Sequence, residues 1–372
     1  MRIAVFSPYP TTPVVHGARV RSAGLACGLA AAGADVTLIS PWHPRSESIP
    51  GIRSVHHRLA ASLLPWALPT DFAPAQALLS LQPTGFGPRR LFARLGRFDV
   101  YQFELCAQAA WMKLVPPGAA AVYSSHNVEQ DFLRSEAHHF RVPANGRVAR
   151  LERSAVRRAD LVLSCSDADT RRMRELYGDH AGLVIPNGPH PELNGAPPPE
   201  LRTAVRERLG LAPDEVAVLF VGGRAAHNRE AVRFLVREVL PDLPERFRLI
   251  LAGRSGEGAG ANGRVIELGE VPDLEAVLAA ADLGVNPGGP PTGTSVKVAD
   301  YLAAGLPVLA TGDGARAREG DGLLNVVDRP ALADAIARAE PRGQGWGPGS
   351  AGHWRRQGER LLAEYRTLLP LG

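Results

Sequence analysis

The chain has 372 residues, of which 45% are hydrophobic and 22% charged, and its formal net charge is +4. This length predicts two or three domains with cores of their own, and the composition is that of an ordinary globular protein. The three cysteines lack metal-ligand spacing, which predicts free thiols in a reducing compartment. The first apolar run is too short for a signal peptide, and no run of about 20 apolar residues occurs, so we expect a cytoplasmic protein without a membrane-spanning helix.

Short apolar runs rich in strand-forming residues alternate with helical patterns, which is typical of parallel α/β units. In the first half, strands are expected at 2–6, 36–40, 99–105, 120–125, 160–166 and 182–186, and a helix at about 18–32. Between 44 and 98 the pattern weakens, and the prolines and aromatic residues there predict helices and loops rather than core strands.

A proline-rich stretch at 189–203 predicts a linker between two domains. The alternation then restarts, with strands expected at 216–222, 248–253, 264–269, 283–287, 307–311 and 323–327, and a last helix at about 353–369. The fold class predicted is therefore α/β, with two Rossmann-like domains. Such a fold binds a ligand near the carboxyl ends of its strands, in the crevice between the domains.

The segment TGTSVKVADYLAAGLPVLA (292–310) predicts a short helix that begins among small polar residues. Gly305 and Pro307 mark its end, and Thr294 or Ser295 is a good N-cap. The helix follows a strand and a glycine-rich loop, so its free N–H groups favour an anion, typically phosphate. The segment therefore predicts a phosphate-binding helix N-terminus.

Two charged residues of this helix fit a nucleotide ligand. Lys297, in the first turn, can reach back to the phosphate, and Asp300, one turn later, can accept hydrogen bonds from two ribose hydroxyls. The same pattern also fits a capped surface helix with an i,i+3 Lys–Asp pair of little stabilising value. The chemistry of these residues alone leaves both interpretations open.

A resemblance favours the first interpretation. Residues 291–311 resemble the donor-site signature of retaining GT-B glycosyltransferases, particularly glycosyltransferase family 4. Residues 124–132, 160–188, 218–235 and 269–287 resemble further motifs of that family in the family's order, and only 44–98 lies outside the resemblance.

The resemblance implies two Rossmann-like domains facing across a cleft, with the C-terminal helix returning to the N-terminal domain. We expect residues 1–188 to form an acceptor domain completed by the helix of 353–372, residues 189–203 to be the linker, and residues 204–345 to bind the nucleotide sugar.

For the donor site, the resemblance implies that Asp300 holds the ribose, while Thr292 stands where the family usually has a glutamate that helps to hold the donor sugar. Amides just ahead of Val296 would bind the diphosphate, and the backbone of 270–272 would lie near the nucleobase. The residues implied to bind the donor are Gly17, Val271, Thr292, Gly293, Thr294, Ser295, Val296 and Asp300.

Three residues are implied to take part in the reaction. Arg224 and Lys297 would stabilise the charge that develops on the diphosphate, and His126, at the end of a strand, would bind sugar or phosphate. Arg224 also fits a solvated loop residue, and His126 a histidine bound by backbone at a strand end. Glu129 and Asp131 fit caps of the following helix. Asn187 with Gly188 resembles the family's turn at the domain junction, and it also fits a plain turn before the linker.

No metal or permanently bound cofactor is expected, because GT-B enzymes generally need no metal for their chemistry. Asp167 and Asp169 form an Asp-x-Asp, but with Ser166 they fit the start of a helix better than a metal site. The helix at 147–160 carries five arginines, which fits a solvated face with Glu152 pairing or a face that contacts anionic lipid. No nucleic-acid partner is expected.

The sequence thus predicts a retaining, metal-independent glycosyltransferase, cytoplasmic or peripheral at the inner face of the membrane. It would move a sugar from a nucleotide-sugar donor to a hydroxyl of a polysaccharide, lipid-linked or secondary-metabolite acceptor. Two alternatives remain open: a related GT-B enzyme such as a nucleotide-sugar epimerase, and a catalytically degenerate binding or scaffold subunit, which the loss of the usual glutamate at Thr292 motivates.

Overall fold

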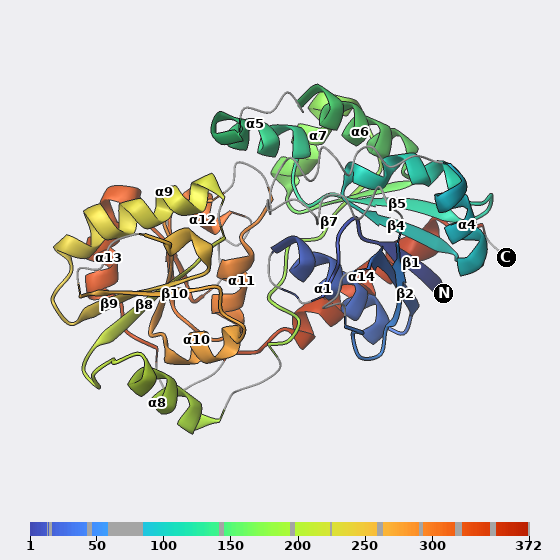
Figure 1. The fold of residues 1–372 in the computed structure, drawn as a ribbon. Coiled ribbons are helices and arrows are strands. Elements are labelled where there is room, and N and C mark those ends of the chain that lie inside the picture. The colour runs from blue at the N-terminus through green and yellow to red at the C-terminus, as the bar shows by residue number, and fades with distance from the viewer. Residues whose placement is uncertain are drawn as a thin grey trace. The chain divides into compact units, whose positions relative to one another are not determined.

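The computed structural model describes residues 1–12, 14, 17–42, 47–58, 85–140, 145–193, 198–223, 225–258, 263–289, 293–316, 322–342 and 347–370. The chain divides into two compact units (Figure 1). One consists of residues 1–187 with 353–372, and the other of residues 188–352. Among the described helices, none is both long and apolar enough to cross a membrane.

The N-terminal unit is built on a parallel seven-stranded sheet with the order β3-β2-β1-β4-β5-β6-β7. Its strands are β1 (Arg2–Phe6), β2 (Asp35–Pro41), β3 (Arg53–His57), β4 (Val100–Glu104), β5 (Ala120–Ser124), β6 (Leu161–Ser164) and β7 (Gly182–Val184). Its helices are α1 (Gly17–Ala31), α4 (Phe86–Leu95), the 3₁₀ helix η2 (Cys106–Leu114), α5 (Glu129–Phe140), α6 (Asn145–Arg158), α7 (Asp167–Tyr177) and α14 (Ala351–Thr367).

The strand β3 differs from the expectation that 44–98 adds only helices and loops. It pairs in parallel with β2, from Thr37 opposite Arg53 to Pro41 opposite His57. Because β3 is an edge strand and only its last residue is buried, its sequence RSVHH lacks the apolar run that marks a central strand. The remaining residues from 59 to 84 and from 43 to 46 lie outside the described part of the chain.

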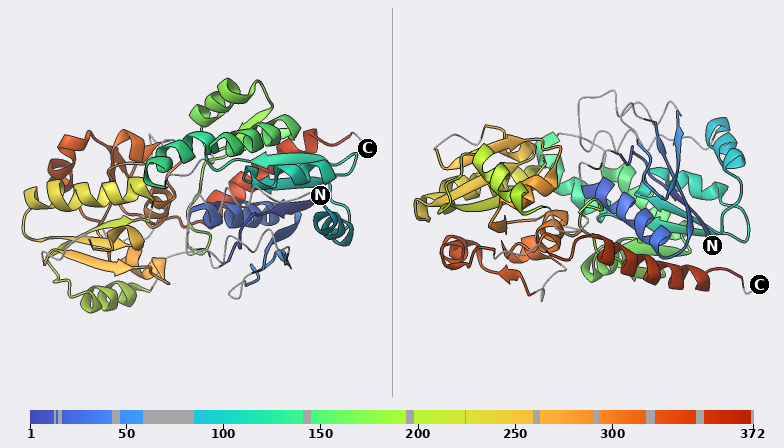
Figure 2. Two further views of the ribbon diagram at one scale, coloured as in Figure 1. Left: turned by 45° about the horizontal axis from the view of Figure 1, so that its top comes forward. Right: turned by 90° about the horizontal axis from the view of Figure 1, so that it is seen from below.

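The C-terminal helix α14 packs on α1, which confirms the expected return to the N-terminal domain (Figure 2). Two glycines allow this close crossing, because a Cβ on Gly358 would lie 2.0 Å from the carbonyl oxygen of Gly28. Further along α14, the Tyr365 hydroxyl donates to Oε1 of Gln102 in β4 at 2.6 Å. The last helix is therefore part of the N-terminal core.

The C-terminal unit is built on a parallel six-stranded sheet with the order β10-β9-β8-β11-β12-β13. Its strands are β8 (Val216–Val221), β9 (Phe247–Ala252), β10 (Val265–Gly269), β11 (Leu283–Asn286), β12 (Val308–Ala310) and β13 (Leu324–Val326). Its helices are α8 (Pro199–Arg208), α9 (Ala226–Phe234), α10 (Leu274–Ala280), α11 (Val296–Ala303), α12 (Gly312–Ala315) and α13 (Leu332–Arg338), with short turns η3 (Leu235–Val239), η4 (Leu240–Asp242), η5 (Arg254–Gly256) and η6 (Arg329–Ala331).

The sheet of this unit is covered on both faces, as its apolar strands require. One core cluster joins the strands to α9 and α13, and another joins them to α10 and α11. The segment expected as a linker contributes to this packing, because Leu193 is buried, its carbonyl accepts from the Ser350 amide at 2.7 Å, and α8 begins at Pro199.

In both sheets the strand order reverses at one point, between β1 and β4 in the N-terminal unit and between β8 and β11 in the C-terminal unit. Parallel α/β sheets bind ligands outside the carboxyl ends of the strands at such a switch point. A ligand site is therefore expected at the carboxyl ends of β1 and β4 or at those of β8 and β11.

Candidate active site

The helix α11 begins close to the end of β11, as the sequence predicts. Ser295 is its N-cap, since its side-chain oxygen accepts from the Val298 amide. Gly293 has φ +77°, which favours glycine, and Thr294 and Ser295 are buried. The helix ends before Gly305, which has φ +75°. The first turn of α11 thus lies at the switch point of the sheet.

Lys297 is held by two asparagine side chains. Its Nζ donates to Oδ1 of Asn228 at 2.7 Å and to Oδ1 of Asn286 at 3.5 Å. The ammonium also lies over the Phe220 ring, 4.3 Å from its centroid. Burial lowers the pKa of Lys297 to about 7. The side chain therefore brings an ammonium group that loses its proton more readily than an ordinary lysine to the ends of β8 and β11.

Asp300 does not pair with Lys297, so the alternative of a surface Lys–Asp pair is wrong. The Asp300 carboxylate is buried, and its Oδ1 accepts from the backbone N–H of His190 at 2.6 Å. The carboxylate thus ties α11 to the first residues of the C-terminal unit.

The structure brings together Gly293, Thr294, Ser295, Val296, Lys297 and Asp300 on α11 and the turn before it. Val271 follows β10 at the same carboxyl edge of the sheet and packs partly buried on the core beneath α11. Gly17 is the first residue of α1 in the other unit. Arg224 and Thr292 lie outside the described residues.

His126, in the N-terminal unit, is a buried residue just beyond the end of β5. Its Nε2 lies 2.6 Å from Oε2 of Glu104, at the end of β4, and its Nδ1 lies 3.4 Å from the Tyr9 hydroxyl. Burial lowers the pKa of His126 more than Glu104 raises it, and the charge of Arg21 lowers it further. Both ring nitrogens thus have partners within this unit.

Glu104 is the residue that orients His126, and the sequence analysis missed it. Burial acts to raise the pKa of its carboxyl, but the hydrogen bond and charge of His126 and the charge of Arg21 bring the pKa below its ordinary value. An ionised Glu104 accepts a hydrogen bond from the Nε2–H of His126. The lone pair of the neutral imidazole then lies on Nδ1. A charged residue at the end of the apolar run VYQFE was the signal that could have found it.

Arg21 of α1 is another buried residue that was missed. Its Nη1 donates to the Ile185 carbonyl at 2.7 Å and to Oδ1 of Asn187 at 3.1 Å, at the end of the N-terminal unit. The guanidinium thus fixes the chain directly before it enters the C-terminal unit, so Asn187 is more than a residue of a plain turn.

Glu152 corrects the expectation of a solvated helix face with Glu152 pairing. Its carboxylate is fully buried and accepts from the amides of Glu129 at 2.9 Å and Gln130 at 3.2 Å, and from the Tyr177 hydroxyl at 2.6 Å. It thus caps the start of α5 from a neighbouring helix, which no local pattern reveals. The arginines Arg150, Arg153, Arg157 and Arg158 of the same helix are exposed.

Two other polar residues of this unit, Ser166 and Asp131, stabilise helices rather than bind a ligand. Ser166 caps α7 by accepting from the Asp169 amide at 3.1 Å, as expected, and Asp131 pairs with Arg172 at 2.6 Å. Within the described ranges, no group of three His, Cys, Asp or Glu residues could hold a metal ion.

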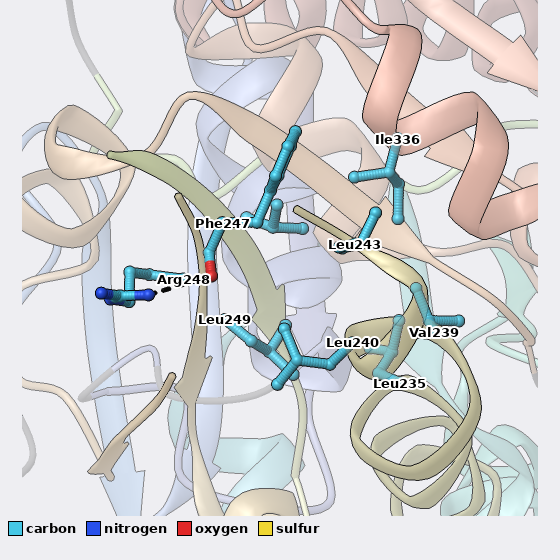
Figure 3. Close-up of a pocket in the computed structure, with 9 residues that line it drawn as sticks. Leu235, Val239, Leu240, Leu243, Phe247, Arg248, Leu249 and Ile336 are labelled. Carbon is cyan, nitrogen blue, oxygen red and sulfur yellow. Dashed lines mark hydrogen bonds between the residues drawn. The ribbon is translucent and has the colours of Figure 1, made fainter. Parts of the chain in front are cut away.

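The pocket drawn in Figure 3 lies within the apolar core of the C-terminal unit. Its lining residues are Val218, Leu235, Val239, Leu240, Leu243, Phe247, Arg248, Leu249 and Ile336. All but Arg248 belong to the core cluster of β8, β9, α9 and α13. None of the predicted site residues lines this gap, so it is a packing feature rather than the ligand site.

Two family matches agree with this arrangement. Residues 16–188 match the family "Glycosyl transferase 4-like domain", and residues 215–339 match "Glycosyl transferases group 1". Together the two matches span most of both units. The chain is a glycosyltransferase.

A curated relative supports this assignment. The glycosyltransferase is 28% identical over 312 residues to D-inositol 3-phosphate glycosyltransferase of Kineococcus radiotolerans, which covers 71% of this chain and 70% of that protein.

Solved structures show that the fold is GT-B. Sucrose-phosphate synthase of Thermosynechococcus elongatus matches with a TM-score of 0.65 and 17% identity, over 99% of this glycosyltransferase and 95% of that chain. HepE of Anabaena, solved in complex with UDP and glucose, matches with a TM-score of 0.60 and 18% identity, over 99% and 97% of the two chains.

The buried carboxyl of Glu129 predicts a pH-dependent stability of this glycosyltransferase. Burial and the charge of Glu152 raise the pKa of Glu129 from 4.5 to about 8. Between these values the folded chain holds a proton that the unfolded chain has lost, so the free energy of unfolding falls as pH rises. Glu129→Gln should therefore increase the free energy of unfolding at pH 8 by about 1–3 kcal/mol and raise the melting temperature there. Near pH 5 both quantities should change little.

Thermal unfolding of both proteins across this pH range is the measurement. Glu175→Gln, at an exposed site on α7, is the matched control and should follow the wild type at every pH. Parallel curves for wild type and Glu129→Gln would contradict the buried proton.

Proposed function

We propose that this glycosyltransferase moves a sugar from a nucleotide-sugar donor to an acceptor hydroxyl, with retention at the anomeric carbon. The diphosphate binds the start of α11, and the N-terminal unit binds the acceptor. The observation that carries the proposal is the joint placement of the N-terminus of α11 and Lys297 at the switch point of the C-terminal sheet. Amides, helix dipole and cation all favour a diphosphate there.

The charge pattern of this site fits the chemistry of transfer. When the bond between the anomeric carbon and the phosphate oxygen breaks, negative charge grows on the diphosphate, and Lys297 and the α11 amides stabilise that charge. The acceptor oxygen bonds to the carbon on the same face, and its proton passes to the leaving phosphate. These groups supply the positive charge without a metal ion. Arg224 would add to that charge, and His126, oriented by Glu104, would bind the donor sugar or phosphate.

A donor screen tests the proposal. We expect UDP-, GDP-, ADP- or dTDP-linked sugars to raise the melting temperature, with UDP the first base to test because HepE was solved with UDP. Candidate acceptors are hydroxyls of polysaccharides, lipid-linked sugars and secondary metabolites. Donor consumed into an epimer without an acceptor would favour an epimerase, and binding without turnover on any acceptor would favour a scaffold subunit.

Asp300→Ala is expected to weaken nucleotide binding by about 1.5–3 kcal/mol, through loss of hydrogen bonds to two ribose hydroxyls. Oδ1 also accepts from the His190 amide, so the melting temperature of Asp300→Ala is measured on the same samples. Isothermal titration with UDP measures the effect. The control is Asp334→Ala, at an exposed position on α13 of the same unit, and wild-type affinity in Asp300→Ala would refute the ribose role.

We further propose that the N-terminal unit docks on anionic membrane. The helices α4, η2 and α6 pack in one core cluster and present no exposed acid, because Glu152 is their one acidic residue and is buried. Phe86, at the start of α4, is 77% exposed. The exposed cations of these helices are Arg89, Arg90, Arg94, Lys113, Arg150, Arg153, Arg157 and Arg158.

Vesicle binding tests this surface. The double variant Arg90→Glu/Arg94→Glu should bind phosphatidylglycerol vesicles at least about tenfold more weakly than wild type, since each cation near such a surface contributes about 1 kcal/mol. The control, Arg233→Glu/Arg237→Glu, reverses two exposed charges in the C-terminal unit and should bind like wild type. Equal wild-type binding to phosphatidylcholine and phosphatidylglycerol vesicles would contradict the proposal.

A further inference from the structure

The ammonium of Lys297 is held by neutral oxygen atoms. Its two hydrogen-bond partners are the amide oxygens of Asn228 and Asn286, and the third neighbour is the face of Phe220. In the described part of the chain it has no carboxylate partner. Three N–H donors with two acceptors leave one donor available. A half-buried cation without a counter-charge is costly unless an anion arrives to neutralise it.

The acids on the surrounding elements are already engaged elsewhere. Glu230 on α9 pairs with Arg329, and Asp313 on α12 pairs with Arg316. Asp300 on α11 accepts from the His190 amide, and the strands β8, β11 and β12 carry no titratable side chain. The other ionisable side chains on α9 and η5 are His227, Arg229, Arg233 and Arg254, of which Arg254 pairs with Glu270.

Asn286 links this cation to the start of α11. It is fully buried at the end of β11, and its Nδ2 donates to the Gly314 carbonyl at 2.9 Å and to the Ser295 hydroxyl at 3.2 Å. Ser295 is itself the N-cap of α11. One amide group thus fixes the helix cap through its nitrogen and contacts the lysine through its oxygen.

Asn228 fixes the cation from the other side of the switch point. It is buried in the first turn of α9, which follows β8, and its amide packs against Gly222, where a Cβ would lie 3.1 Å from Cγ of Asn228. The side chain therefore has little freedom to turn away from Lys297. Two asparagines, one at the end of β11 and one in the first turn of α9, converge on one ammonium.

We infer that Asn228 and Asn286 are positioning residues of the donor site, which hold the Lys297 ammonium in place and leave its charge for a diphosphate to neutralise. This inference rests on the proposed function and names residues that the sequence motifs do not. A carboxylate at either position would hold the lysine equally well, but it would neutralise the cation and repel the diphosphate. The lowered pKa of Lys297 agrees with a cation that lacks a counter-charge.

The two lysines of the chain, Lys113 and Lys297, make a direct test possible. Protein labelled with ¹³C at lysine Cε gives two NMR signals, and Lys297→Asn assigns them. In wild type the Lys297 signal should titrate well below that of exposed Lys113, and added UDP or pyrophosphate should raise its midpoint. Asn228→Asp should raise the midpoint without ligand, whereas the control Asn325→Asp, an exposed position on β13, should not.

The titration can overturn the inference without any activity assay. A Lys297 midpoint that equals the Lys113 midpoint, or one that Asn228→Asp leaves unchanged, would show that the asparagines do not keep an uncompensated cation. Asn286→Asp provides a second variant for the same measurement, in case Asn228→Asp does not fold.

An exchange of the two side chains tests the placement of the charge. Lys297→Asn should weaken binding of UDP and of pyrophosphate at least about tenfold. In the double variant Asn228→Lys/Lys297→Asn, the cation comes from α9 to the same contact, and we expect affinity within about threefold of wild type. A folded double variant that binds as weakly as Lys297→Asn would overturn the inference.

Failure of the proposed function gives a different result. If wild-type protein binds no nucleoside diphosphate and no pyrophosphate, the donor-site proposal fails. If wild type binds UDP and Asn228→Asp binds it equally well, the donor site stands and the positioning role of Asn228 is refuted.

Discussion

Replacement of Lys297 by glutamine is expected to lower kcat/KM for the donor by about 100- to 1,000-fold, the usual loss when a preorganised group that faces developing charge is removed. The melting temperature should stay the same or rise, because the burial that lowers the pKa of Lys297 to about 7 makes the cation a cost to the folded state. Release of nucleoside diphosphate, with calorimetry of the same samples, measures both effects. Wild-type turnover in Lys297→Gln would remove the residue from the reaction.

The pH dependence of kcat/KM distinguishes the effect of the charge of Lys297 from the effect of its size and shape. If the protonated lysine is the active form, kcat/KM of the wild type should fall as pH rises through about 7, since this profile reports groups of the free enzyme. Lys297→Arg is the matched variant, because guanidinium stays charged at these pH values. Its activity should be lower than wild type but should lack this descending limb.

Glu104→Ala is expected to destabilise the N-terminal unit by about 1–3 kcal/mol, because removal of the carboxylate leaves the buried Nε2–H of His126 without its hydrogen-bond acceptor. The substitution removes the hydrogen-bond acceptor of His126 Nε2 and also that of the Gln102 side chain. Turnover should fall as well, since His126 loses the contact that orients its ring. Denaturant unfolding and donor turnover are the two measurements.

A conservative variant distinguishes the two roles of Glu104. Glu104→Gln keeps a carbonyl oxygen for the His126 N–H, so it should lose less stability than Glu104→Ala. Tyr365→Phe, which removes only the bond from α14 to Gln102, serves as the control for damage to the same core. If Tyr365→Phe lowers turnover as much as Glu104→Ala does at equal stability, the orientation of His126 by Glu104 is not the cause.

Local sequence signals were sufficient for the framework of this glycosyltransferase. Strands and helices alternate with clear periods, so the parallel α/β class and the positions of the central strands follow from the pattern. The cap at Ser295, the end of α11 at Gly305 and the cap at Ser166 are also local, because each depends on residues within one turn of a helix. The edge strand β3 was missed because only its last residue is buried, so its sequence lacks an apolar pattern.

The partners of the charged site residues were decided by the tertiary structure alone. Lys297 could equally have paired with Asp300, three residues away, yet it contacts asparagines that lie 69 and 11 residues away in the chain. In the same way, the tertiary structure places His126 in a hydrogen bond with Glu104 and Asp300 in a hydrogen bond with the His190 amide. Parallel strands bring their carboxyl ends to one edge whatever their separation in sequence, so the sequence determined which groups the site contains, and only the packing of the sheets decided which of them meet.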